Sequence, residues 1–345
     1  MKDVINMSFF ENPIISKMAA HDHEQVVFCR DNNTGLKAII AIHSTVLGPS
    51  LGGVRMWNYN NEREAIQDVL RLSEAMTYKA SISGLNLGGG KSVIIGNSKK
   101  EKSKALIRKF GQFIETLGGK YIAAEDVGIS TKDIEYMRME TSHLSGMPES
   151  KGGGGDPSPN TAYGVYMGMK ACAKECFGND SLESKRIVVQ GAGHVGTHLV
   201  KQLVKEKANV IVSDVDEEKI KKLVKTYHVE SVGVNDVYDL ETDIYSPCAL
   251  GATLNNNTLS RLKCSIIAGA ANNQLADEEV HSRMVVEKGF LYAPDFVINA
   301  GGLINCYSEV IGYNKEYVLG EVENIYSSVL KIIKKSKKDN LPDLP

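Results

Sequence analysis

Along the N-terminal part of the chain, apolar and polar residues alternate in some segments with the two-residue period of a β-strand and in others with the period of an α-helix. Residues 24–30 (EQVVFCR) and 36–43 (LKAIIAIH) are rich in β-branched residues and flank the turn DNNTG, which predicts two paired strands. In residues 61–79 the apolar side chains fall on one helical face, and charged ones such as Asp68 fall largely on the other. A helix is therefore expected there, with Lys79 at its end.

The same alternation continues towards the middle of the chain. Residues 103–119 predict a helix, YIAAEDVG (121–128) contains a strand that ends at Glu125 and Asp126, and residues 130–140 predict another helix. Open α/β sheets keep their functional groups just outside the carboxyl ends of the strands. Asp126 is therefore a candidate functional residue.

A glycine- and proline-rich segment, SKGGGGDPSPN (residues 150–160), interrupts the pattern and is interpreted as a hinge or linker. Beyond it a helix is expected at 161–178, a strand at 186–190, a helix at 197–207 and a strand at 209–214. Strand–helix alternation on both sides of the break predicts an α/β fold of two domains.

The segment RIVVQGAGHVGTHLV fits the dinucleotide-binding pattern, with a strand before the glycines and a helix after them. Gly191 makes the turn, Gly193 lets a pyrophosphate approach the backbone, and Gly196 lets helix pack on sheet. Asp214 ends the next strand 23 residues past Gly191, close to the usual spacing of about 20. A plain strand–helix turn is the alternative. The predicted cofactor contacts of this motif are Gly191, Gly193, His194, Val195, Gly196 and Asp214. An acid at 214 accepts ribose hydroxyls and repels a 2′-phosphate, which favours NAD over NADP.

A second glycine-rich stretch, GLNLGGGKSVIIG, raises the question of a nucleoside-triphosphate loop. The pair Gly90-Lys91 fits that motif, but Gly84 stands one place too early. The strand expected at residues 93–95 also follows the lysine, whereas the motif has a strand before it and a helix after it. The stretch is therefore interpreted as a lysine held against backbone for other chemistry.

Composition narrows the function classes. The chain has 345 residues, 42% hydrophobic and 24% charged, with a formal net charge of −2. This suits two globular domains and gives no electrostatic reason to expect a nucleic acid or a membrane as partner. The six cysteines lack zinc-site spacing, so no metal is expected. The N-terminus has no signal-peptide pattern and no segment is apolar enough to span a bilayer, which predicts a cytoplasmic protein.

Several further motifs occur together in one order: LGPSLGGVRMW, MTYKA, GLNLGGGKSVIIG, AEDVG, PSPNTAYGVY, PCALGATLN, AGAANNQL and YAPDFVINAGGLIN. On these the chain resembles the glutamate/leucine/phenylalanine/valine dehydrogenases, and most closely their leucine-specific branch, from about Gln25 to Lys337. The resemblance implies a substrate-binding and catalytic domain at 1–146 and, across a cleft, a Rossmann-type NAD domain at 147–330. It also implies a segment at 331–345 that returns to the first domain. A homo-oligomer is implied too, but the chain ends where relatives usually continue for another helix, which leaves the oligomeric state open.

The resemblance also assigns catalytic roles. Lys91 is similar to the family's general base, which activates the water that attacks an iminium, and the neighbouring glycines let the amino acid lie close to the chain. Lys79 pairs with the substrate carboxylate, helped by the backbone of Gly52 and Gly53, and Asp126 exchanges a proton with the amino group. A pair of surface cations is the alternative for the two lysines.

Other positions are implied to orient or enclose the ligands. Thr161 and Asn272 orient the nicotinamide or the substrate, with Asn273 as the alternative to Asn272. Cys248 and Ala249 line the NAD site, although Cys248 as a core thiol is an equal alternative.

The implied reaction is the reversible oxidative deamination of an L-amino acid to its 2-oxo acid and ammonia. Glutamate-specific members place a lysine at Leu51 and a serine near Cys306, and neither partner for a side-chain carboxylate is present. An apolar pocket is implied instead, formed by Leu51, Ala124, Leu303 and Cys306. Branched aliphatic substrates (leucine, valine, isoleucine) fit it best. An aromatic amino-acid dehydrogenase, for phenylalanine or tryptophan, is the alternative, and a non-catalytic NAD-binding sensor is the alternative from another class.

Overall fold

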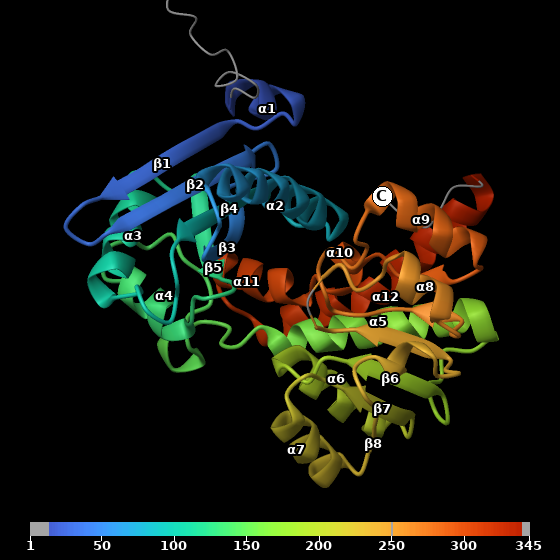
Figure 1. The fold of residues 1–345 in the computed structure, drawn as a ribbon. Coiled ribbons are helices and arrows are strands. Elements are labelled where there is room, and N and C mark those ends of the chain that lie inside the picture. The colour runs from blue at the N-terminus through green and yellow to red at the C-terminus, as the bar shows by residue number, and fades with distance from the viewer. Residues whose placement is uncertain (1–13, 250, 340–345) are drawn as a thin grey trace, which may run out of the picture. The chain divides into compact units, whose positions relative to one another are not determined.

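The computed structural model describes residues 14–249 and 251–339, which form two compact units (Figure 1). The units comprise residues 1–155 and 156–345 of the chain. The division falls inside SKGGGGDPSPN, where the glycine and proline content predicted a break. After the short helical turn η2 (Glu149–Lys151), the second unit begins with α5, which starts at Ser158.

The first unit contains a five-stranded mixed sheet in the order β1-β2-β4-β3-β5. Its strands are β1 (Gln25–Asp31), β2 (Leu36–Ser44), β3 (Ser50–Trp57), β4 (Gly88–Ile95) and β5 (Tyr121–Glu125). The predicted β1–β2 hairpin is antiparallel, and β3 runs parallel to both β4 and β5. Strand β3 was not predicted, because its two glycines weaken the strand pattern.

Helices cover both faces of this sheet (Figure 1). On one face α2 (Glu62–Ile82) packs Ala65 and Val69 against Val93. On the other face lie α3 (Lys104–Glu115) and α4 (Thr131–Met137), which bury Phe110 and Ile134 against strands that include Val54. A further α-helix in the described part of this unit is α1 (Ile14–Ala20). These two apolar layers hold the strands rigidly. The carboxyl ends of the strands remain available to position functional side chains.

The second unit contains a six-stranded parallel sheet in the order β11-β10-β9-β6-β7-β8. Its strands are β6 (Arg186–Gln190), β7 (Asn209–Ser213), β8 (Glu230–Ser231), β9 (Ile244–Pro247), β10 (Ile266–Ile267) and β11 (Leu291–Tyr292). Counted from β6, this is the 3-2-1-4-5-6 order of the dinucleotide-binding fold. The strand order therefore reverses between β6 and β9, which is where such sheets bind their ligands.

Helices complete the second unit. They are α5 (Ser158–Phe177), α6 (His194–Lys205), α7 (Glu217–Tyr227), η3 (Asp236–Tyr238), α8 (Asn256–Arg261), α9 (Glu278–Glu287), α10 (Asp295–Ile298), α11 (Gly301–Ile311) and α12 (Lys315–Asp339). Among residues 14–249 and 251–339, no helix combines the length and apolar character that crossing a bilayer requires.

Helix α12 packs along α5 and belongs to the second unit. Its buried side chains continue as far as Ile333, and Lys337 Nζ lies 2.5 Å from Glu175 Oε1 of α5. The sequence implied that residues 331–345 return to the first domain, and the described part of that segment instead continues on α5. The reason is the apolar stripe of α12, which extends to Ile333 and keeps the helix packed on α5. Residues 340–345 lie outside the described part of the chain.

Candidate functional site

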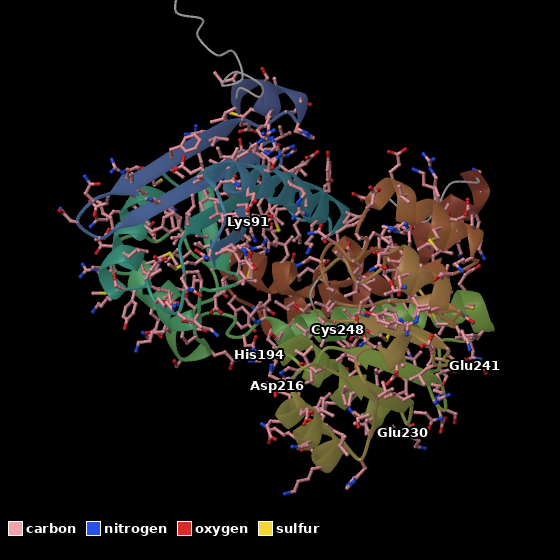
Figure 2. The ribbon with its side chains drawn as sticks, viewed as in Figure 1. Lys91, His194, Asp216, Glu230, Glu241 and Cys248 are labelled. Carbon is pink, nitrogen blue, oxygen red and sulfur yellow. The ribbon has the colours of Figure 1, made fainter. Side chains whose placement is uncertain are left out.

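Lys91 lies within strand β4, whereas the sequence predicted a strand that starts after it (Figure 2). β4 already begins at Gly88, and Lys91 pairs with Ala41 of β2. The residue is only 7% exposed. The next helix, α3, begins only at Lys104, so the glycine run does not lead into a helix N-terminus. The geometry agrees with the sequence argument that this is not a phosphate loop.

Lys91 and Asp126 form a close ion pair. Asp126 follows β5, as predicted, and its Oδ2 lies 2.5 Å from Lys91 Nζ. Gly53 of β3 leaves the space for this pair, because a Cβ there would lie 2.7 Å from Asp126 Cβ and 3.2 Å from Lys91 Nζ. Three parallel strands therefore bring one glycine, one ammonium group and one carboxylate together.

The electrostatic surroundings keep Asp126 ionised. Burial raises the pKa of this carboxyl, but the Lys91 ammonium and the Arg55 guanidinium outweigh burial and lower the pKa to about 2. Arg55 Nε lies 3.3 Å from Asp126 Oδ2. At neutral pH Asp126 is therefore a carboxylate with no proton to donate. Sequence reasoning did not identify Arg55, although it stands two residues after Gly53 and so shares its side of the strand.

The three glycines before Lys91 have a packing role that the sequence analysis did not identify, and their proposed closeness to the amino acid stays a prediction. A Cβ at Gly88 would lie 1.8 Å from Ser44 O, and one at Gly90 would lie 2.7 Å from the Tyr121 ring. A Cβ at Gly89 would lie 2.2 Å from the backbone nitrogen of Thr77 in α2. The protein's own atoms therefore fill these spaces. Because Thr77 touches the start of β4, the last turns of α2, which carry Lys79, are held against this strand.

Two predicted pocket residues share the sheet face of Lys91. Ala124 pairs with Gly53 and Leu51 pairs with Gly89, so both stand on strands next to the ion pair. Both are buried. Since side chains alternate along a strand, the neighbouring Ala123 faces the opposite apolar layer, in which it packs.

In the second unit the three glycines after β6 have separate roles. Gly191 has φ +117°, and a Cβ there would lie 2.7 Å from the backbone nitrogen of Ala249. A Cβ at Gly196 would lie 1.9 Å from the carbonyl oxygen of Gly191. Beside Gly193, by contrast, no atom of the described chain would lie within 4 Å. The turn is thus tightly packed at its first and third glycines and open at the second, as a bound pyrophosphate requires.

Helix α6 starts beside this open position. His194 and Val195 are its first residues, and the cap residue Gly193 supplies no side-chain acceptor to the free N–H groups (Figure 2). Unpaired N–H groups and the helix dipole favour an anion there.

Asp214 follows β7 and is tied to the same turn. Its Oδ2 accepts a hydrogen bond from the N–H of Ala192 at 2.6 Å, and its Oδ1 accepts one from Asp216 at 2.8 Å. Each carboxylate oxygen keeps a further acceptor site for a hydroxyl group. The open glycine, the uncapped helix and this acid together fit NAD.

Cys248 and Ala249 follow β9, on the other side of the point where the strand order reverses. The N–H of Cys248 donates to Gln190 O at 2.7 Å, which holds this turn beside Gly191. Burial raises the pKa of the Cys248 thiol. The thiol, labelled in Figure 2, is therefore protonated and uncharged at neutral pH.

The two polar residues expected to orient the ligands lie on different elements of the second unit. Thr161 is in the first turn of α5, where its hydroxyl donates to Pro157 O at 3.0 Å. Asn272 follows β10, and its Oδ1 accepts from Asn299 Nδ2 at 2.8 Å. The alternative, Asn273, has a left-handed φ of +50°.

Leu303 and Cys306, the other two predicted pocket residues, lie one turn apart on α11 and are buried. Close packing fixes this helix, because a Cβ at Gly301 would lie 2.1 Å from Asn160 O of α5.

Comparison with known proteins agrees with this architecture. Residues 23–143 match the model for the Glu/Leu/Phe/Val dehydrogenase dimerisation domain, and residues 212–341 match that for glutamate/leucine/phenylalanine/valine dehydrogenase. Residues 171–247 match the shikimate/quinate 5-dehydrogenase model, within the dinucleotide-binding unit.

Curated relatives and a solved structure match nearly the whole chain. The chain is 52% identical to a leucine dehydrogenase of Thermoactinomyces intermedius, over 95% of this chain and 90% of that protein. It is 46% identical to a phenylalanine dehydrogenase of Caldalkalibacillus thermarum, over 92% and 87%. The crystal structure of L-tryptophan dehydrogenase from Nostoc punctiforme superimposes with a TM-score of 0.82 at 41% identity, covering 95% of this chain and 94% of that one. The chain therefore belongs to the glutamate/leucine/phenylalanine/valine dehydrogenase family.

Proposed function

We propose that this protein is an NAD-dependent dehydrogenase that converts a branched-chain aliphatic L-amino acid reversibly to its 2-oxo acid and ammonia. The observation that carries the proposal is the buried Lys91–Asp126 pair at 2.5 Å, positioned by three adjacent strands. A general base and a proton acceptor placed side by side are what deamination requires.

Each catalytic residue has a defined task. Lys91, once neutral, takes a proton from the water that attacks the iminium carbon. Asp126, ionised next to Lys91, accepts a proton from the substrate ammonium and returns one to the departing ammonia. Lys79 pairs with the substrate carboxylate, and the backbone of Gly52 and Gly53 supports that binding.

NAD is the proposed cofactor, and when bound it accepts the hydride from the substrate Cα. Gly193 and the α6 N-terminus would hold the pyrophosphate, and Asp214 would accept hydrogen bonds from the ribose. The further proposed contacts are Gly191, His194, Val195, Gly196, Thr161, Cys248, Ala249 and Asn272.

An aliphatic substrate is supported by the character of the proposed pocket. Leu51 and Ala124 share the sheet face of Lys91, and neither can pair with a carboxylate. Leu303 and Cys306 are the remaining proposed pocket residues. Burying an unpaired substrate carboxylate would cost several kcal/mol. The higher identity to the leucine enzyme, 52% against 46%, favours aliphatic over aromatic substrates.

A substrate panel tests this function. Leucine, valine, isoleucine, phenylalanine, tryptophan and glutamate are supplied with NAD, and nicotinamide absorbance is followed. We expect the branched aliphatic acids to give the highest kcat/KM and glutamate to give no measurable rate. A higher value for phenylalanine or tryptophan would establish the aromatic alternative, since pocket shape alone separates these classes by about 1–3 kcal/mol per methylene. No reduction of NAD with any member would refute the enzymatic function.

Substitution of Asp214 tests the cofactor site. Asp214→Ala should raise the KM for NAD and reduce the preference for NAD over NADP. Both effects are expected because the substitution removes the hydrogen bonds to the ribose and the repulsion of the 2′-phosphate together. Asp216→Ala is the matched control, since it removes a carboxylate two residues away that caps α7 instead. KM values for both cofactors are measured in each variant. If both variants lost the preference for NAD over NADP to the same extent, the general negative charge of this region, and not Asp214, would set the preference.

We further expect a cytoplasmic homo-oligomer that binds neither nucleic acid nor membranes. The match of residues 23–143 to a dimerisation domain supports self-association, and the net charge of −2 gives polyanions no attraction.

A further inference from the structure

A chain of polar contacts runs from Asp126 away from Lys91 and into helix α2. Arg55 Nε lies 3.3 Å from Asp126 Oδ2, and the Nη1 of the same guanidinium donates to Asp68 Oδ2 at 2.9 Å. The Tyr59 hydroxyl donates to that same Asp68 oxygen at 2.7 Å. Asp68 was expected to point largely away from the buried face of the helix, and this expectation is wrong. Its side chain is 17% exposed and faces the sheet.

The fold leaves Arg55 little freedom. Alternation along β3 sends Val54 and Met56 into one apolar layer and Arg55 to the other side, towards α2. There the guanidinium is 22% exposed and spans two carboxylates. Because its donors lie in one rigid plane, contact with both carboxylates fixes its orientation. Arg55 thus connects α2 to Asp126 through one hydrogen bond and one ion pair.

We propose that Arg55 is a positioning residue that holds Asp126 ionised and aimed at Lys91, so that the proton of this pair rests on the lysine until substrate binds. This inference rests on the proposed dehydrogenase function. Arg55 need not touch the substrate. Its anchor is Asp68, which Tyr59 and Arg71 hold in turn.

The charges that surround Asp126 support this role. The titratable groups facing it are Lys91 on β4, Arg55 on β3, Asp68 and Tyr59 behind Arg55, and Tyr121 on β5. Burial lowers the pKa of Arg55, but Asp126 and Asp68 outweigh burial and raise it. Burial and the bond to Asp68 raise the pKa of Tyr59, so the phenol stays neutral. Arg55 is therefore a permanent cation beside Asp126, whereas Lys91 must lose its proton during the reaction.

The test compares two arginines that both bind Asp68. Arg71 Nη2 donates to Asp68 Oδ1 at 3.0 Å, and its side chain is 53% exposed. Within the described part of the chain it forms no ion pair with Asp126, unlike Arg55, which makes Arg71→Gln the matched control for Arg55→Gln. The pH dependence of kcat/KM is measured with the best amino acid of the panel. Loss of a cation beside a carboxylate favours the protonated form by about 1–3 pH units, and the pair titrates as one system. We expect the acid limb of Arg55→Gln to move upward by about that amount, and that of Arg71→Gln to stay at the wild-type position.

Two further variants separate positioning from charge. Arg55→Lys keeps the cation but cannot contact both carboxylates, so kcat should fall while the acid limb stays near that of the wild type. Asp68→Asn keeps Arg55 charged and is the variant to use if Arg55→Gln does not fold. It should lower kcat with little change in KM.

The outcomes separate this inference from the proposed function. An unchanged acid limb in Arg55→Gln, an equal shift in Arg71→Gln, or wild-type kcat in both Arg55→Lys and Asp68→Asn would overturn the role of Arg55 while the enzyme remains a dehydrogenase. A wild-type protein that reduces no NAD with any amino acid would instead refute the function itself.

Discussion

Lys91→Ala is expected to lower kcat by about 10²–10⁴, the usual contribution of a positioned general base. The substitution removes the ammonium group that lies 2.5 Å from Asp126. The other cation in contact with Asp126 is Arg55, whose guanidinium does not lose a proton readily and so cannot replace Lys91 as the base. Folding should be preserved, since Arg55 still partners the Asp126 carboxylate. Steady-state kinetics and NAD binding by fluorescence titration provide the measurements.

Lys79→Ala is the comparison for this variant. It should chiefly raise KM, because the proposed contact with the substrate carboxylate is present in both the ground state and the transition state. NAD affinity should match the wild type in both variants. Near-normal turnover of Lys91→Ala would remove the base from the mechanism, and loss of NAD affinity in that variant would revive the phosphate-loop interpretation.

Gly89→Ala is expected to destabilise the protein by about 3 kcal/mol or more, at the upper end of the cost of overpacking. The added methyl group would lie 2.2 Å from both the backbone nitrogen and the hydroxyl oxygen of Thr77, and 2.5 Å from the carbonyl oxygen of Ser73. Backbone atoms of a helix cannot move aside singly, so α2 must separate from β4. The urea midpoint of unfolding and the yield of soluble protein report the loss.

Gly84→Ala in the same stretch is the control. No described atom lies within 4 Å of the added methyl group, and only the left-handed φ of +67° opposes it, at about 1–2 kcal/mol. The stability of Gly89→Ala should fall clearly below that of Gly84→Ala. If Gly89→Ala instead folds like the wild type and shows only a raised KM, the glycine serves the substrate and the packing argument is wrong.

The sequence predicted the parts of the fold whose signals are local. The β1–β2 hairpin, the strand that ends before Asp126 and the strand–turn–helix around Gly191 were all visible as short patterns with turn residues at their ends. Strand β3 was not visible, because Gly52 and Gly53 remove the side chains that mark a strand.

The missing strand explains what else could not be predicted. Without β3 in register, nothing in the sequence shows that Gly53 faces Lys91 or that Arg55 reaches both Asp68 and Asp126. These contacts join residues from separate elements, so only pairing of the strands reveals them. The packing role of the glycine run was missed for the same reason, since a missing side chain makes room equally for a ligand and for a neighbouring helix.

The hydrogen bond from Ala192 to Asp214 has a consequence for redesign of cofactor preference. Replacing Asp214 to admit the 2′-phosphate of NADP also removes the carboxylate oxygen that accepts the Ala192 N–H at 2.6 Å and so holds the glycine turn. Asparagine at position 214 would retain an oxygen for that N–H while discarding the charge, whereas alanine would discard both. Charge reversal at this site should therefore begin from Asp214→Asn, with a cation introduced on a neighbouring residue, so that the altered enzyme keeps the turn on which either cofactor depends.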